Sequence, residues 1–127
     1  MSWEHFEIRD QGICTVLVTD TNERTQCHYE LGIITTGKSR MFWGYQIIIN
    51  YKDVTIAGRS KGYSETYSQA LKDCNTQMAE QGLTLLVAGN LPTYSESAMS
   101  GPAGHGYIKG YQTGVRIMSP DDVFITT

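Results

Sequence analysis

The chain has 127 residues, of which 10 are basic and 13 are acidic, so its formal net charge is −3. This length is enough for one domain with a core of its own. The acidic balance argues against a nucleic-acid-binding protein, which usually carries a basic excess. No stretch approaches the roughly 20 apolar residues of a membrane span, and the N-terminus lacks the pattern of a secretion signal. We therefore expect a single soluble domain over residues 1–127, located in the cytoplasm.

Strand patterns dominate the first half of the chain. Runs of β-branched and alternating apolar residues predict strands over 3–8, 13–19, 25–35, 41–51 and 54–58. The triplet Asp10-Gln11-Gly12 predicts a turn between the first two strands. The strand over 41–51 is the clearest, and its alternation places Trp43 and Tyr45 on one face. The later four strands are expected to pair as two hairpins.

One amphipathic helix follows, over about 64–81. Its apolar stripe, at the spacing of a 3.6-residue turn, consists of Tyr67, Ala70, Leu71, Cys74 and Met78. Ser64 is the expected N-cap, and Gly82 is the expected left-handed stop. The apolar run over 83–87 then predicts a short buried strand.

Residues 88–114 are rich in glycine and predict loops or broken structure. Short strands are predicted over 107–110, 115–118 and 123–126, with one helical turn within 92–99. A single amphipathic helix among many strands must bury its stripe against them. The predicted fold class is therefore α+β, with a mainly antiparallel sheet of hairpins and one long helix packed on one face.

The three cysteines, Cys14, Cys27 and Cys74, have no disulfide or zinc-binding spacing. Cys74 belongs to the helix stripe and is expected in the core. His28 directly follows Cys27, and adjacent residues of a strand point to opposite faces, so the two cannot share a metal ion. We expect no metal and no cofactor.

The densest group of polar side chains near glycines is the segment 94–101, followed by His105. Its Ser, Glu and His residues could form a nucleophilic arrangement. There is, however, no G-x-S-x-G motif, and serines here are typical of caps and turns. The run 101–106 also lacks the ending of a phosphate-binding loop. We therefore expect a protein that is not an enzyme. The alternative is a small enzyme or ligand-binding domain with a pocket under the glycine-rich segment 88–111.

Charge is distributed unevenly, because acids dominate the first 30 residues and bases dominate residues 38–61. The simplest interpretation is two solvated faces of a sheet, and the sharper one is an acidic patch for a basic partner. Tyrosines in the glycine-rich segment also suit an interface, since they combine apolar area with a polar tip. The candidate partner-binding residues are Glu4, Glu7, Asp10, Asp20, Glu23, Glu30, Tyr94, Glu96, Tyr107 and Tyr111.

Four short runs of the segment 82–118 follow a recognisable order. They are Val-Ala-Gly-Asn at the end of a strand, Thr-Tyr-Ser-Glu-Ser-Ala-Met-Ser, Gly-His-Gly-Tyr-Ile-Lys-Gly, and Val-Arg-Ile-Met. This order resembles a family of bacterial immunity proteins from toxin–immunity systems, including contact-dependent inhibition and polymorphic toxins. The resemblance covers about a third of the chain. Such proteins are non-catalytic and cytosolic, and they block a cognate toxin by covering its active site or binding beside it.

The resemblance implies a non-catalytic immunity-like protein that binds and neutralises a bacterial toxin. A nuclease is the first expectation for the toxin, since nucleic acids are the commonest intracellular targets of such toxins. A nuclease groove is basic, so the acids of this chain could mimic nucleic acid there. We expect a protein partner, no direct contact with nucleic acid and no membrane. A third interpretation is a structural subunit that pairs through an edge strand.

Overall fold

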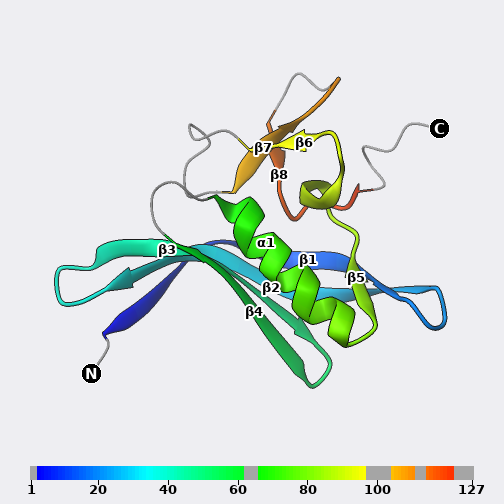
Figure 1. Cartoon of the computed structure of the whole chain (residues 1–127), viewed down its shortest axis with the longest axis horizontal. Coiled ribbons are helices and arrows are strands. Elements are labelled where there is room, and N and C mark those ends of the chain that lie inside the picture. The colour runs from blue at the N-terminus through cyan, green and yellow to red at the C-terminus, as the bar shows by residue number, and fades with distance from the viewer. Residues whose placement is uncertain (1–2, 62–65, 97–103, 111–113, 122–127) are drawn as a thin grey trace.

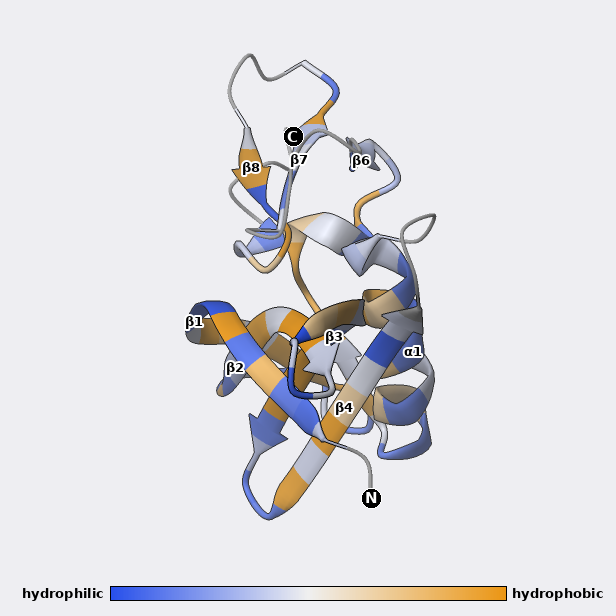
Figure 2. Ribbon diagram, turned by 90° about the vertical axis from the view of Figure 1, so that its left-hand side faces the viewer, coloured by the Kyte–Doolittle hydropathy of each residue, from blue (hydrophilic) through white to orange (hydrophobic). Residues whose placement is uncertain are grey.

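The computed structural model describes residues 3–61, 66–96, 104–110 and 114–121. The fold is α+β, as predicted (Figure 1). A curled antiparallel sheet has the strand order β4-β3-β2-β1-β5, and a second, small sheet has the order β6-β7-β8. The elements of the large sheet are β1 (Glu4–Val18), β2 (Glu23–Thr36), β3 (Met41–Tyr51), β4 (Val54–Lys61) and β5 (Leu83–Leu85). Hydrophobic and hydrophilic residues alternate along its strands (Figure 2), as expected of a sheet with one face on a core.

β1 is one continuous strand, so the predicted turn at Asp10-Gln11-Gly12 is wrong. Those three residues pair with β2, and the register shifts between Ile8 and Asp10. Arg9 is thereby an extra residue, which makes a β-bulge that bends the strand. Opposite the bulge, a Cβ on Gly32 would overlap the carbonyl oxygen of Glu7. The turn-forming residues of this region therefore lie beside a bend in β1, and Gly32 allows β2 to approach β1 closely there.

A second irregularity lies in β3, whose bounds match the prediction. Its register with β2 shifts between Ile34, which is opposite Gly44, and Thr35, which is opposite Phe42, so Trp43 is an extra residue in β3. The ring of Phe42 packs edge-on against Tyr45, with 5.2 Å between centroids. Trp43 instead lies beneath the guanidinium of Arg59, which bonds to the side chain of Gln46. Gln46 directly follows Tyr45 in β3, so its side chain points to the opposite face of the sheet. Trp43 and Gln46 both contact Arg59, so Trp43 lies on that opposite face. The prediction that Trp43 and Tyr45 share a face is therefore wrong.

The helix α1 (Tyr67–Glu80) begins later than predicted. Its N-cap is Thr66, which forms a capping box with Gln69. The predicted cap, Ser64, lies outside the described residues. Gly82 has a φ of 70°, as expected for a left-handed stop. The predicted stripe, from Tyr67 to Met78, is the buried face of the helix.

α1 lies directly on the sheet, and the contact is closest at Gly58 of β4. A Cβ at this position would overlap the carbonyl oxygen of Ala70 and would lie 2.6 Å from Cys74 Sγ. The main core joins the helix stripe to one face of the sheet, and it includes Cys14, Val16, Leu31, Ile47, Ile49, Leu71, Cys74, Met78 and Leu85. Lys72 and Glu80 lie on the opposite face of the helix and are exposed.

α1 also covers the middle of the outer edge of β4. The side chain of Gln77 donates from Nε2 to the carbonyl oxygen of Ala57, at 2.8 Å. The backbone N–H of Arg59 donates to Asp73 Oδ2, at 3.1 Å. Backbone groups that would otherwise face solvent at a sheet edge are thus bonded to helix side chains.

The described residues after β5 form more regular structure than the sequence indicates. A 3₁₀ helix, η1 (Ala88–Asn90), precedes the small sheet of β6 (Tyr94–Ser95), β7 (His105–Ile108) and β8 (Val115–Arg116). The helical turn predicted within 92–99 is wrong at β6, and the predicted last strand over 123–126 lies outside the described residues. Figure 1 shows the small sheet beside the N-terminal end of α1.

Candidate functional site

Three of the candidate acids are bonded to arginines. Glu4 pairs with Arg59, Glu7 with Arg9 and Arg40, and Asp10 with Arg116. Two of these arginines belong to the basic segment 38–61, so the oppositely charged parts of the sequence meet in the fold. Asp10 also accepts a hydrogen bond from the hydroxyl of Tyr29, at 2.7 Å. The acids of β1 are therefore largely neutralised by their neighbours.

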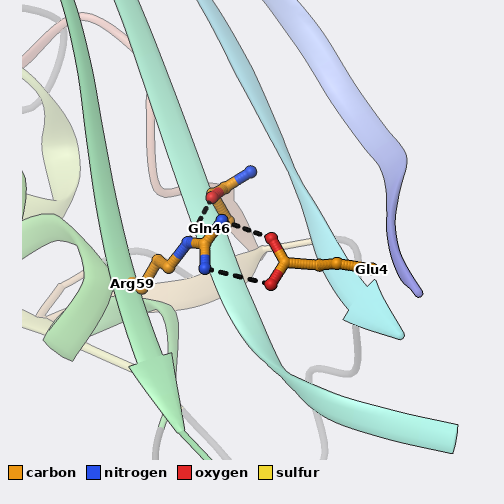
Figure 3. Close-up of polar contacts among 3 residues, drawn as sticks. All are labelled: Glu4, Gln46 and Arg59. Carbon is orange, nitrogen blue, oxygen red and sulfur yellow. Dashed lines mark hydrogen bonds and ion pairs between the residues drawn. The ribbon is translucent and has the colours of Figure 1, made fainter. Parts of the chain in front are cut away.

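The pair between Glu4 and Arg59 shows how strongly the sheet curls (Figure 3). β1 and β4 are separated by two strands, so in a flat sheet they would lie roughly 14 Å apart. Instead the two side chains meet, and Arg59 also donates to Gln46 Oε1 at 2.6 Å. Both charged side chains are more than a third exposed, which limits the pair to about 1 kcal/mol of stability. The pair is informative because it shows that β1 and β4 come close together in the curled sheet.

The other acids lie elsewhere. Asp20 and Glu23 are exposed at the tip of the β1–β2 hairpin, and Glu30 is half-buried within β2. At roughly 3.3 Å per residue, the 15-residue strand β1 separates Glu4 from the hairpin tip by about 50 Å of strand. The six acids therefore do not gather into one patch.

Glu96 lies at the N-terminus of α1. It accepts a hydrogen bond from the backbone N–H of Ser68, at 3.3 Å. Burial raises the pKa of Glu96, and hydrogen bonds from Thr66, Ser68 and Tyr67 act in the opposite direction. A carboxylate beside free helix N–H groups is also favoured by the helix dipole. Glu96, which sequence analysis placed among the interface residues, is thus built into the helix start.

Tyrosines gather around this carboxylate. The rings of Tyr45 and Tyr67 lie 4.5 Å apart. Burial raises the pKa of Tyr45, Tyr67 and Tyr94, and the charge of Glu96 raises each further. Glu96 Oε1 and the hydroxyl of Tyr94 are buried, and neither has a hydrogen-bond partner among the described residues. Buried polar atoms are normally bonded, so this Glu96–tyrosine cluster has free capacity for a water molecule or a ligand.

Replacing Glu96 by glutamine should stabilise the protein at neutral pH. Because its pKa is raised in the fold, the folded protein holds a proton there more readily than the unfolded chain does. The stabilising contribution of Glu96 is therefore fully present below about 4.3, the pKa of a glutamate in the unfolded chain. It is lost as the pH rises through the pKa of Glu96 in the folded protein. Glutamine stays neutral, so the gain should grow from acidic to neutral pH. Urea unfolding at a series of pH values measures it.

Glu80→Gln is the matched control, because Glu80 is exposed at the other end of α1. It should change stability little. A Glu96→Gln variant that is less stable than wild type at neutral pH would contradict the prediction, and would show that the hydrogen bonds outweigh burial.

The open edge of β1 is the second feature of interest. β2 pairs with β1 from Glu4 to Val18, but on the other side β5 pairs only with Val16 to Val18. Among the described residues, no strand pairs with that outer side of β1 between Glu4 and Cys14. Ile8 and Ile13, at 44% and 55% exposure, are large apolar side chains on this same stretch. An unpaired edge with exposed apolar residues is a template for another strand.

The remaining candidates are dispersed. Tyr107 is half exposed on β7, whereas Tyr94 is partly buried in the Glu96–tyrosine cluster. Tyr111 and Ser97 lie outside the described residues. His105 is half-buried on β7. Sequence reasoning missed Tyr45 and Tyr67 as members of a polar cluster, because their place in apolar patterns indicates core packing alone.

An open groove lies between α1, β5 and η1, at the start of the glycine-rich segment. It is lined by Asn75, Ala79, Leu83, Thr84, Leu85 and Asn90. The amides of Asn75 and Asn90 bond to each other across it, at 2.8 Å and 3.1 Å. The lining offers amide and hydroxyl groups but no acid or base, so it does not carry the chemistry that the enzyme alternative requires.

In the part of the chain that is described, no group of three or more His, Cys, Asp and Glu side chains is placed to hold a metal ion. No helix there is long and apolar enough to cross a membrane. Comparison with known proteins gives no significant match to a family model, a curated protein or a solved structure.

Proposed function

We propose that this protein is a non-catalytic binding protein that neutralises a bacterial toxin, and that it holds the toxin through the open edge of β1. The sequence resemblance supports the class of function. The edge supports the mode of binding, since a partner strand can add to it by main-chain hydrogen bonds while side chains give specificity. The toxin is proposed to act in the cytoplasm, beside its inhibitor.

The unpaired stretch of β1 is the observation that carries this proposal. Thr19 and Thr15 form backbone hydrogen bonds on the β5 side. The register is regular from Asp10 to Val18, so alternation places the backbone groups of Gln11 and Ile13 on that same side. Among the described residues, no backbone group bonds to them, and the exposed side chain of Ile13 lies beside them.

Replacing Ile13 by proline should weaken binding at least tenfold and leave the fold intact. Proline removes the outward N–H, which β2 does not use, and proline is tolerated on edge strands in this orientation. The measurement is the affinity for the purified product of the adjacent gene, since toxin and immunity genes are usually neighbours. We expect at least a tenfold loss, about 1.4 kcal/mol, with an unchanged circular dichroism spectrum.

Thr55→Pro is the matched control, because it removes an outward N–H from the opposite edge, in β4. This variant should bind as wild type does. If Ile13→Pro binds equally well while folded, the edge is not the binding surface. If the neighbouring product does not bind the wild-type protein at all, the toxin assignment fails as well.

Two further binding measurements with the same partner protein distinguish edge pairing from charge mimicry. Reversal of Asp20 and Glu23, which are exposed and outside the ion pairs described above, should slow association only if the partner presents a basic groove. A nuclease partner bound by its groove would also lose on-rate as salt is raised. Edge pairing predicts little change in either test.

The Glu96–tyrosine cluster supports a second candidate function, the binding of a small ligand. The unbonded oxygen atoms of Glu96 and Tyr94 are the observation that favours it. A ligand with a hydrogen-bond donor would satisfy both. A thermal-shift screen of small molecules should then find stabilisers whose effect disappears in Tyr94→Phe. Stabilisers that act equally on this variant would bind elsewhere.

A further inference from the structure

Two of the three cysteines lie side by side in the core. Cys14 of β1 is directly opposite Cys27 of β2 in the register of the hairpin. Their sulfur atoms are 3.3 Å apart, and the residues are 1% and 5% exposed. Both are free thiols. The third cysteine, Cys74, differs because its thiol donates to the carbonyl oxygen of Ile47.

The geometry of this pair suits a covalent bond. Directly opposed residues of antiparallel strands have Cα atoms roughly 4.5–5.5 Å apart, and disulfides span about 4.4–6.8 Å between Cα atoms. The two sulfur atoms need to approach by little more than about 1 Å to reach bonding distance. Rotation of the side chains within their rotamers can supply that movement without a shift of either strand.

We propose that Cys14 and Cys27 form a reversible redox pair that closes into a cross-strand disulfide under oxidising conditions. The oxidant is a low-molecular-weight disulfide. The pair is a modification site in the β1–β2 hairpin and does not depend on the binding function proposed above.

The reaction is a double thiol–disulfide exchange. The Cys27 thiolate attacks one sulfur of the small disulfide, forms a mixed disulfide and releases one small thiolate. Cys14 then loses its proton to solvent and attacks Cys27 Sγ, which releases the second small thiolate. The two small thiolates take up two protons, so two protein thiols are oxidised as one small disulfide is reduced to two thiols.

The local environment favours this order of attack. The hydrogen bond from Cys14 lowers the pKa of Cys27, although burial opposes the effect. The same hydrogen bond, followed by burial, raises the pKa of Cys14. The small disulfide can reach these buried sulfur atoms only when the hairpin opens locally. Among the described residues, no strand pairs with the outer side of β1 between Glu4 and Cys14, so this part of β1 can separate from β2 without breaking a second set of strand hydrogen bonds.

Incubation of the folded protein with mixtures of reduced and oxidised glutathione tests the proposal. Before alkylation, oxidised wild type should be lighter than reduced wild type by two hydrogen atoms. After acid quenching and alkylation, it should carry one alkyl group instead of three, because two of its three thiols are in the disulfide. Trypsin cleaves at Arg24, between the two cysteines, so the fragment 10–24 should be found joined to the fragment 25–38. Circular dichroism before and after oxidation checks that the protein stays folded.

Cys74→Ser is the matched control and should oxidise as wild type does. Cys14→Ala and Cys27→Ala should each give no joined fragments. The proposal is overturned if wild type oxidises only in denaturant, if glutathione stays attached to Cys27 as the end product, or if Cys74 takes part in the bond. Because the fragment map is read on wild type, the test holds even if a cysteine variant fails to fold.

Discussion

Replacing Leu71 by alanine should lower the free energy of unfolding by about 2–5 kcal/mol. Leu71 is 1% exposed in the middle of the buried face of α1. Its Cδ2 atom also lies close to Gly89, so the side chain joins the helix both to the sheet core and to η1. Alanine would leave a cavity that three elements cannot all close. Urea unfolding followed by circular dichroism measures the loss.

Lys72→Ala is the control for Leu71→Ala, because the next residue of the same helix is exposed. Alanine has a helix propensity similar to or better than that of lysine, so this change should alter stability by less than about 0.5 kcal/mol. A loss of that small size for Leu71→Ala would mean that the apolar stripe does not face the core.

Replacing Gly58 by alanine should cost about 1–3 kcal/mol, or more if the helix cannot move. The added methyl group would overlap the carbonyl oxygen of Ala70 and lie 2.7 Å from the backbone nitrogen of Cys74. Both are backbone atoms within α1, so no rotamer change relieves the overlap. The helix must move away from β4, and the hydrogen bond between Gln77 and Ala57 should weaken with it. Thermal unfolding and amide exchange at Ala57 measure these effects.

Gly12→Ala is the matched control for Gly58→Ala. It adds the same methyl group to a strand glycine, but the nearest atom would be a ring carbon of Tyr29 at 3.5 Å, an ordinary contact. Stability should therefore change little. If both alanine variants were equally stable, the close approach of α1 to β4 would be wrong.

Local patterns were sufficient to predict the main elements. The strand over 41–51, the helix stripe from Tyr67 to Met78 and the stop at Gly82 each depend on neighbours in sequence. Alternation and helical periodicity report which face is buried, and that fixed the α+β class before any contact was known. The N-cap was misplaced because Ser64 and Thr66 are both good caps, and the capping box with Gln69 favours the second.

The two bulges could not be predicted in the same way. Asp10-Gln11-Gly12 has the composition of a turn, and only its partner strand shows that the chain continues through it. At Trp43 one extra residue in β3 changes which side chains share a face. A bulge depends on the alignment of two strands, which no single-strand pattern contains.

The candidate site was only partly accessible to sequence reasoning. The acids were seen as an unpaired excess, because Arg40, Arg59 and Arg116, which bond to them, lie far along the chain in the β2–β3 turn, β4 and β8. Counting outward from the turn after Val18 would have placed Cys14 opposite Cys27. Glu96 was named, but its role at the start of α1 depends on a contact across 28 positions of the chain.

The contrast between the two edges of the large sheet has a consequence for stoichiometry. Filaments grow when a subunit offers two complementary surfaces that can be joined head to tail without limit. Here the middle of the β4 edge is bonded to Gln77 and Asp73 of α1, whereas no described strand pairs with the outer side of β1 between Glu4 and Cys14. A subunit with one available edge can join a single neighbour, after which growth stops. If partners join only through this stretch of β1, complexes of two members are expected and open-ended polymers are not.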